Sequence, residues 1–265
     1  MTSLRRAALS VFAISAFYGA AMAQDAADPL RAIGGGIGVV SEPYMELDDE
    51  TSFYPVPLLY LDGGRFSVAG TTASVRLYKN DRWEFAAMAD YRFGGYEAED
   101  SPVFVGMEDR NGTLELGGWV AFNIDDQIYL TGYAQQDVLD EHGGFELRAQ
   151  AAWSINPHRA TNITPSVGFA FRSEDLADYY YGVTEDEELL ITDFNGTGED
   201  YLRYAYASGE TVTPYAGISI RQALSPKWAV FVSARHEFLP DEVEDSPIVD
   251  GDGRTVGGVT LGRLF

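Results

Sequence analysis

Apolar and polar side chains alternate along this chain in runs of about ten residues, the spacing of β-strands with two different faces. The alternation is clear in residues 83–93, 145–155, 211–221 and 228–238. One face of the second run carries Phe145, Leu147, Ala149, Ala151, Trp153 and Ile155. The opposite face carries Glu146, Arg148 and Gln150. Runs of this length and period are typical of strands that cross a membrane in a β-barrel.

Alternation alone also fits a soluble β-protein, because an antiparallel sheet with one solvated face has the same period. Two features favour a membrane barrel. The apolar faces often begin or end with Trp, Phe or Tyr, as the aromatic girdles of membrane barrels do. The polar faces carry both signs of charge in mid-strand, which suits an enclosed polar lumen. On period alone, the soluble alternative stays open.

The lengths of the connections indicate how the strands are oriented. Short turns occur at 62–64, 79–81, 125–126, 156–160 and 224–226, and long polar loops at 42–53, 94–111, 173–210 and 240–253. If a first strand at 31–41 runs outward, every short turn is periplasmic and every long loop is external, as in outer-membrane barrels. This arrangement requires the stretch 65–79 to break near Gly70. The prediction is then an all-β antiparallel barrel of about twelve strands, whereas an unbroken stretch gives eleven and violates the even count.

The two ends of the chain carry features of an exported barrel. Arg5 and Arg6 precede an uncharged, mostly apolar run, and Ala21-Met22-Ala23 forms a small-x-small cleavage pattern. This predicts a signal peptide at 1–23 and one barrel domain at 24–265, because the apolar run is shorter than the roughly 20 residues of a spanning helix. The last strand, 254–265, ends in Phe265, which resembles the signal read by the barrel assembly machinery, although Arg263 departs from its pattern.

Composition excludes several classes of protein. The net charge is −23, and removal of Arg5 and Arg6 would make it more negative by two, which argues against a nucleic-acid partner. Cysteine is absent, so disulfides and thiolate metal sites are excluded. The 16 Tyr, 15 Phe, 4 Trp and 28 Gly suit strands, turns and interfacial rings better than a helical enzyme. The sequence indicates no cofactor.

Charged side chains on the polar faces are predicted to line the lumen. They are Arg76, Glu84, Asp90, Arg92, Glu115, Glu146, Arg148, Arg221, Arg235 and Glu237. Five are basic and five acidic, so the predicted lumen is nearly neutral. One interpretation is a selective pore; the other is a charge-paired interior that fills the barrel, since buried charges persist when they are paired. The size of a twelve-stranded barrel favours a filled or narrowly open lumen.

The three histidines give weak support for catalysis or metal binding. His142 is predicted in an outer loop, His158 in a periplasmic turn, and His236 on the lipid-facing side near the outer end of a strand. Outer-membrane phospholipases use a Ser-His pair on this outer face, but the outward neighbours predicted for His236 include no Ser, and Thr255 is predicted inward. Fragments beginning at Asp193 and Asp250 resemble calcium loops but lack the closing acid, so they are interpreted as turns.

Several short motifs occur in an order that resembles the MipA/OmpV family of outer-membrane proteins. A tyrosine-rich element, Tyr179-Tyr180-Tyr181-Gly182-Val183, resembles the YYGV element of that family. Pro55 and Pro57 followed by Tyr60 resemble its early P-x-P…Y strand. Ser246-Pro247 resembles its S-P element, and Phe265 matches its terminal aromatic. The resemblance runs over most of the chain after the signal peptide.

This resemblance implies a non-enzymatic barrel that acts as a binding platform in peptidoglycan biogenesis. The partners it implies are a murein hydrolase and a murein synthase, in addition to outer-membrane lipid, lipopolysaccharide and the barrel assembly machinery. The alternative is a narrow porin-like channel for small solutes, and a lipid-active enzyme rests on His236 alone. The tyrosine-rich element lies in the longest outer loop, where we expect it to fold back over the barrel mouth; an exposed adhesive patch is the alternative.

Overall fold

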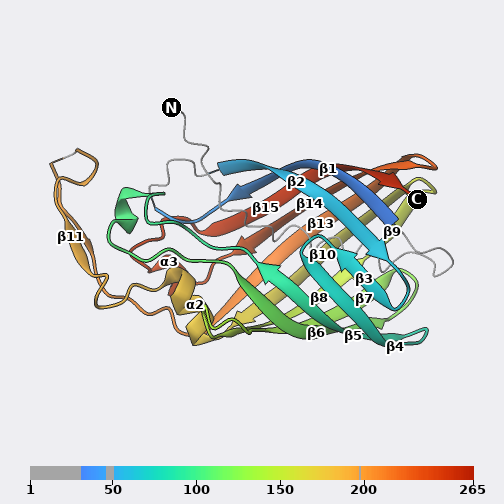
Figure 1. Ribbon diagram of the computed structural model, residues 1–265, viewed down its shortest axis with the longest axis horizontal. Helices are drawn as coiled ribbons and strands as arrows, with labels where there is room; N and C mark the ends of the chain where they lie inside the picture. Colours follow the sequence, from blue (N-terminus) through green and yellow to red (C-terminus); the bar gives the residue numbers. More distant parts are fainter. Residues whose placement is uncertain (1–30, 46–50, 197) are drawn as a thin grey trace.

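The computed structural model, which describes residues 31–45, 51–196 and 198–265, is a closed antiparallel β-barrel (Figure 1). The signal peptide predicted at 1–23 lies outside these residues. The twelve barrel strands are β1 (Arg31–Ser41), β2 (Thr51–Asp62), β3 (Phe66–Ala69), β4 (Thr72–Lys79), β5 (Trp83–Arg92), β6 (Thr113–Asn123), β7 (Ile128–Asp137), β8 (Phe145–Trp153), β10 (Thr161–Arg172), β13 (Thr211–Ser225), β14 (Trp228–Phe238) and β15 (Gly253–Leu264). A short strand, β9 (Ile155–His158), extends β8 along β10. Pairing of β1 with β15 closes the wall and confirms the predicted barrel.

The predicted break at Gly70 is confirmed and brings the barrel to twelve strands. Gly70 has a φ of +58°, in the left-handed region that favours glycine, and separates β3 from β4. The hairpin is short: β3 pairs with β2 only from Tyr60 to Asp62. The outer part of β2 therefore extends beyond the end of this hairpin.

Two prolines lie on the edge of β2 that the short hairpin leaves uncovered. The carbonyl of Leu59 accepts the N–H of Gly70 at 2.9 Å, so Leu59 directs its backbone polar groups away from β1. Residues two apart in a strand direct these groups to the same edge, so Pro57, Pro55 and Phe53 face this way too. No strand in the described part of the chain pairs with this stretch of edge. Proline has no N–H to leave unpaired there, which explains its place in a membrane strand.

Glycines let β1 approach β15 closely. A Cβ added at Gly34 or Gly36 would lie 1.9 or 1.8 Å from the carbonyl oxygen of Leu261 or Val259. A Cβ on the intervening Gly35 would meet nothing closer than 3.4 Å. Only Gly34 and Gly36 are therefore required by contact with the neighbouring backbone.

The barrel wall has a lipid face and a lumen face, as the alternation predicted. Trp83, Phe85, Trp153 and Trp228 are exposed near the short-turn end of the wall, where an aromatic girdle is expected. No helix among residues 31–45, 51–196 and 198–265 is long and apolar enough to cross a membrane. The short turns and the C-terminus lie together at one end, and the long loops lie at the other (Figure 1).

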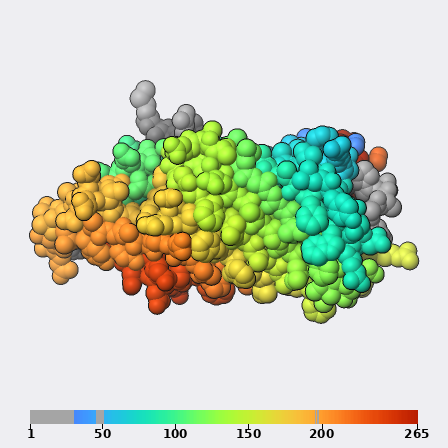
Figure 2. Space-filling view, turned by 90° about the horizontal axis from the view of Figure 1, so that it is seen from below, coloured from blue at the N-terminus to red at the C-terminus, as the bar shows by residue number. Residues whose placement is uncertain are grey.

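The long loops contain more regular structure than the sequence indicated. They hold η2 (Pro102–Phe104), α2 (Glu174–Tyr181), β11 (Leu189–Ile191), η3 (Phe194–Gly196), β12 (Tyr201–Arg203) and α3 (Asp241–Glu244). The predicted loop at 42–53 is shorter than expected, because β2 begins at Thr51. The hairpin of β11 and β12 extends farthest from the barrel, and Figure 2 shows this orange segment as an arm beyond the green and cyan wall.

Candidate functional site

The mouth of the barrel is covered by a compact structure that four outer loops build. Its core, which we name the mouth core, consists of Tyr44, Tyr96, Val103, Phe104, Met107, Tyr181, Val183, Leu239, Val243, Ile248 and Val249. Aromatic rings form its centre: Tyr96 stacks on Phe104 at 4.0 Å between centroids, and the edge of Tyr44 contacts Tyr96 at 5.1 Å. Buried apolar side chains from four loops hold each loop in a fixed position over the lumen.

The tyrosine-rich element lies on helix α2, which turns back over the mouth. Tyr181 is buried in the mouth core, whereas Tyr180 donates a hydrogen bond to the carbonyl of Phe93 at 3.4 Å. Tyr179 contacts two other loops: its hydroxyl accepts the N–H of Asn111 at 2.6 Å in the loop before β6 and donates to Glu141 at 3.1 Å in the loop before β8. Each of the three consecutive tyrosines therefore contacts a different part of the barrel mouth.

Helix α2 ends at Tyr181 with Gly182 as its C-cap, and the S-P element meets the tyrosine-rich element there. A Cβ on Gly182 would lie 2.5 Å from the carbonyl oxygen of Asp178, which the N–H of Gly182 already contacts. The hydroxyl of Ser246 donates to the carbonyl of Tyr181 at 2.6 Å, so the S-P element binds directly to the tyrosine-rich element. Val183 pairs with Tyr206 in an isolated β-bridge.

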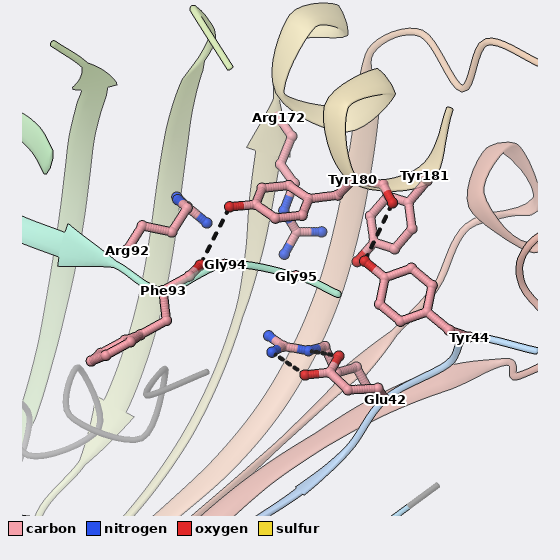
Figure 3. A pocket seen from close by; sticks show the side chains of 10 residues that line it. Glu42, Tyr44, Arg92, Phe93, Gly94, Gly95, Arg172, Tyr180 and Tyr181 are labelled. Carbon is pink, nitrogen blue, oxygen red and sulfur yellow. Dashed lines mark hydrogen bonds and ion pairs between the residues drawn. The ribbon is translucent and has the colours of Figure 1, made fainter. Parts of the chain in front are cut away.

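Beneath α2 lies a small mouth cavity with three arginines in its lining (Figure 3). It is lined by Glu42, Tyr44, Arg92, Phe93, Gly94, Gly95, Arg172, Tyr180, Tyr181 and Arg254. Its volume is about 30 Å³, which is room for one or two water molecules. In Figure 3 the ring of Tyr180 lies between Arg92 and the Tyr44–Tyr181 pair. The cavity is therefore too small to hold a solute such as a sugar or an amino acid.

Below this cavity, a continuous network of buried ion pairs spans the lumen. Glu146 is its hub: its carboxylate lies 2.8 Å from Arg148 Nε, 3.2 Å from Arg172 Nε and 3.6 Å from Arg92 Nη2. Arg92 also pairs with Glu115 at 2.7 Å, and Arg172 extends the network to Glu237 at 2.8 Å.

Further contacts complete this network. Arg235 pairs with Glu237 at 2.7 Å and lies over the ring of Tyr215 at 5.2 Å from its centroid. Arg254 and Glu42 form a bidentate pair at 2.6 and 2.7 Å beside the mouth cavity. Charges that are paired in this way can be buried, and together they fill the upper lumen.

The structure places all ten predicted lumen charges at inward positions, six of them in this network and four outside it. Arg92, Glu115, Glu146, Arg148, Arg235 and Glu237 belong to the network. Glu84 pairs with Arg76 and Lys79 nearer the short-turn end, while Asp90 accepts the hydroxyls of Thr71 and Thr72. Arg221 is half-buried below the network.

Sequence reasoning missed three charged members of the site. Arg172 and Arg254 share the inward alternation of Ala170 and Val256, so the pattern itself could have revealed them. Glu42 lies beyond the end of β1, where alternation gives no guidance. His142, predicted in an outer loop, is buried at the mouth with Nε2 at 3.4 Å from Glu115. It lies there because Asp137 accepts the N–H groups of His142 and Gly143.

His236 faces outward, as predicted, but the predicted orientation of Thr255 was wrong. Thr255 faces the same side, and its hydroxyl lies 2.8 Å from His236 Nδ1. It has the same parity as Val259 and Leu261, and β14 and β15 pair without a bulge, so it must share their face. The ring of Phe238 contacts the imidazole at 4.7 Å. His158 is exposed in the turn region at the other end of the barrel.

The remaining motif residues lie on the wall and its ends. Pro55 and Pro57 occupy the uncovered edge of β2, and Tyr60 packs against a buried cluster around Leu58 and Phe231. Phe265 is exposed at the end of β15, where its N–H binds the carbonyl of Arg31. Asp193 accepts the N–H of Gly198 at 2.7 Å, as a turn residue does. No group of three or more acids and histidines suited to a metal ion occurs in the described ranges.

One buried ion pair fixes the loops above the mouth. Glu187 pairs with Arg110 at 3.0 Å and accepts the N–H of Thr184 at 3.0 Å. Burial acts to raise the pKa of Glu187, but the hydrogen bond from Thr184 and the charge of Arg110 outweigh it and hold this pKa below its ordinary value. Burial raises the pKa of Tyr179, and its contact with Glu141 adds to this. The surroundings of these loops therefore favour the charged form of Glu187 and the neutral form of Tyr179.

A closed twelve-stranded barrel with short turns at one end, long loops at the other and a lipid-facing apolar wall defines this chain as an outer-membrane β-barrel. The family model "MltA-interacting protein MipA" matches residues 33–265, and the chain belongs to the MipA family. The MltA-interacting protein of Escherichia coli (strain K12) is 30% identical over 256 residues, covering 94% of each chain. The outer membrane protein OmpV of Vibrio cholerae serotype O1 is 25% identical over 170 residues, covering 64% of this chain and 61% of OmpV.

Solved outer-membrane barrels are similar only at a distance. The NanC porin has 7% sequence identity and a TM-score of 0.41, and the match covers 88% of this chain and 98% of the porin. OmpT of Vibrio cholerae has 8% identity and a TM-score of 0.39, covering 90% and 97%.

Proposed function

We propose that this chain is a non-enzymatic adaptor that holds a murein-modifying enzyme at the outer membrane. The relative whose name states an interaction with MltA aligns over 94% of both chains, which supports a partner of that kind. The filled lumen is the structural observation that carries the proposal. The hub at Glu146 and helix α2 occupy the path that a solute would take, so the barrel wall serves to anchor the protein.

The adaptor has the domain plan that the sequence indicates, with export by residues 1–23 and a barrel formed by 24–265. The exposed ring of Phe265 at the end of β15 serves as the assembly signal for the barrel machinery. The apolar outer wall contacts outer-membrane lipid, and the external loops lie beside lipopolysaccharide. A murein hydrolase is the first partner we propose, and a murein synthase is the second.

Two measurements on the purified protein test this function against the alternative of a narrow channel. The chain and the MltA protein of the same bacterium are expected to co-purify from cross-linked envelopes. The same preparation is expected to give a flat current trace in planar bilayers. Discrete conductance steps together with absence of MltA from the cross-linked complex would favour the channel and overturn the adaptor.

A further inference from the structure

Exposed basic side chains are confined to one end of this acidic protein. In the part of the chain that the structure describes, they are Arg31, Arg65, Lys79, Arg82, Arg159, Lys227 and Arg263. All seven lie in the short turns or at the strand ends next to them. Every other Lys or Arg between residues 31 and 265 is buried or half-buried. The exposed acidic side chains at this end are Asp81, Asp125 and Asp126, whereas Asp62 is half-buried and Glu84 is buried.

The opposite end has the reverse character. Its exposed acidic side chains include Glu97, Glu99, Glu108, Asp109, Glu185, Asp186, Glu188, Asp241, Glu242 and Glu244. No Lys or Arg is exposed in the described loops at that end. The net charge of −23 thus conceals two poles of opposite sign, of which the periplasmic one is basic.

The seven cations differ in what surrounds them. Lys79 pairs with Glu84 at 3.1 Å, so its charge is partly compensated. Arg31 and Arg263 occupy outward positions on β1 and β15, next to the apolar side chains of Ile33 and Leu261, where an arginine reaches lipid headgroups. The charge of Lys79 is therefore balanced by Glu84, and the charges of Arg31 and Arg263 are balanced by lipid headgroups.

The other four form a set that we name the turn cations: Arg65, Arg82, Arg159 and Lys227. Each lies in a different periplasmic turn, beyond the last residue of its strand. Within residues 31–45, 51–196 and 198–265, none of them has an ion pair. The fifth turn carries Asp125 and Asp126, and Asp125 is engaged by the N–H groups of Gln127 and Ile128.

We propose that the turn cations form a docking ring for an acidic face of a periplasmic protein; this rests on the adaptor function and specifies its partner surface. One cation on each of four turns presents positive charge across the whole end of the barrel. Such an arrangement attracts and orients an anionic partner, and its effect is strongest at low ionic strength. Lipid headgroups, by contrast, surround the wall at the level of the aromatic girdle.

The test compares binding of the purified MltA protein of the same bacterium to full-length protein in nanodiscs. The loss variant reverses the four turn cations: Arg65→Glu, Arg82→Glu, Arg159→Glu and Lys227→Glu. The gain variant adds cations by Asp81→Lys and Asp126→Lys, neither of whose carboxylates caps a turn. The membrane control is Arg31→Glu with Arg263→Glu. Heat-modifiable gel mobility confirms that each variant has folded.

The loss variant is expected to bind at least roughly tenfold more weakly than the wild type, because four exposed ion pairs are replaced by repulsion. The gain variant is expected to bind severalfold more tightly. Added salt is expected to weaken binding by the wild type and to strengthen binding by the loss variant, because salt screens attraction and repulsion alike. Equal binding by wild type and both variants would overturn the docking ring and leave the adaptor function intact. Equal weakening by the membrane control would overturn it in favour of lipid contact. A wild type that does not bind MltA at any salt concentration would overturn the adaptor function and the ring with it.

Discussion

The hydroxyl of Ser246 donates a hydrogen bond of 2.6 Å to the carbonyl of Tyr181, although 65 residues separate them. Both groups are buried, and Tyr181 is the last residue of helix α2. This contact joins the loop after β14 to the loop after β10 directly above the lumen. The closure of the mouth therefore depends on a bond between two short motifs that neither loop could form alone.

Replacement of Ser246 by Ala is expected to loosen helix α2 without unfolding the barrel. The carbonyl of Tyr181 would lose a buried partner, at a cost of about 1–3 kcal/mol. Hydrogen exchange of α2 is expected to accelerate, while exchange of the wall strands stays unchanged. Ser225→Ala, at the exposed periplasmic end of β13, is the matched control. Unaltered exchange of α2 in S246A would contradict the role of this bond.

The buried hub should be sensitive to the loss of one charge. Glu146→Gln leaves Arg92, Arg148 and Arg172 with one carboxylate fewer, and removal of one partner from a buried network costs about 3–5 kcal/mol. The midpoint of urea unfolding, followed by tryptophan fluorescence, is expected to fall markedly. Glu84→Gln is the comparison, because its basic partners have side chains 26% and 42% exposed and its loss should cost less. Equal shifts in the two variants would argue against a special hub.

Adjacent glycines of β1 should differ in their tolerance of a methyl group. Gly36→Ala places a Cβ 1.8 Å from the carbonyl oxygen of Val259, so the strands must separate. Gly35→Ala meets only an ordinary contact at 3.4 Å. G36A is expected to lose its heat-modifiable mobility at a lower temperature than the wild type, and G35A to match the wild type. A reversed order would mean that β1 and β15 do not approach each other as the structure shows.

The prolines of β2 should stabilise the wall, in contrast to their usual effect in sheets. Pro57→Ala introduces an N–H at the uncovered edge, where an unsatisfied group in lipid costs several kcal/mol. The variant is expected to unfold at a lower urea concentration in bilayers. The control is Leu59→Ala on the same strand. Because Leu59 already has a backbone N–H, this variant loses apolar contact without adding an N–H group. Unchanged stability of P57A would indicate that this edge finds a partner in the membrane.

Acid should loosen the outer loops before it affects the barrel. The pKa of Glu187 lies below its value in the unfolded chain, so its contribution to stability is present above about pH 4 and is lost as the pH falls through the folded pKa. Protease cleavage in residues 184–210 is expected to increase on acidification while the heat-modifiable mobility persists. In Glu187→Gln this cleavage should already be high at neutral pH and depend less on pH. Cleavage that stays constant with pH in the wild type would contradict this ion pair.

Much of the wall could be predicted from the sequence, because alternation reports on a local property. In a strand, successive side chains point to opposite faces, so the lumen charges and the lipid-facing rings follow from parity. The break at Gly70 followed from the requirement of an even number of strands. The same parity would have assigned Arg172 and Arg254 to the lumen and Thr255 to the outer face.

Only the tertiary structure decided how the mouth is closed and which charges meet. His142 contacts Glu115, and Ser246 contacts Tyr181, because closure of the sheet brings loops from distant parts of the chain over one lumen. No local period records such contacts, since loop conformation depends on the buried core that the loops form together. The sequence by itself determined a barrel with a polar interior; the three-dimensional packing of its outer loops determined that this interior is filled and covered.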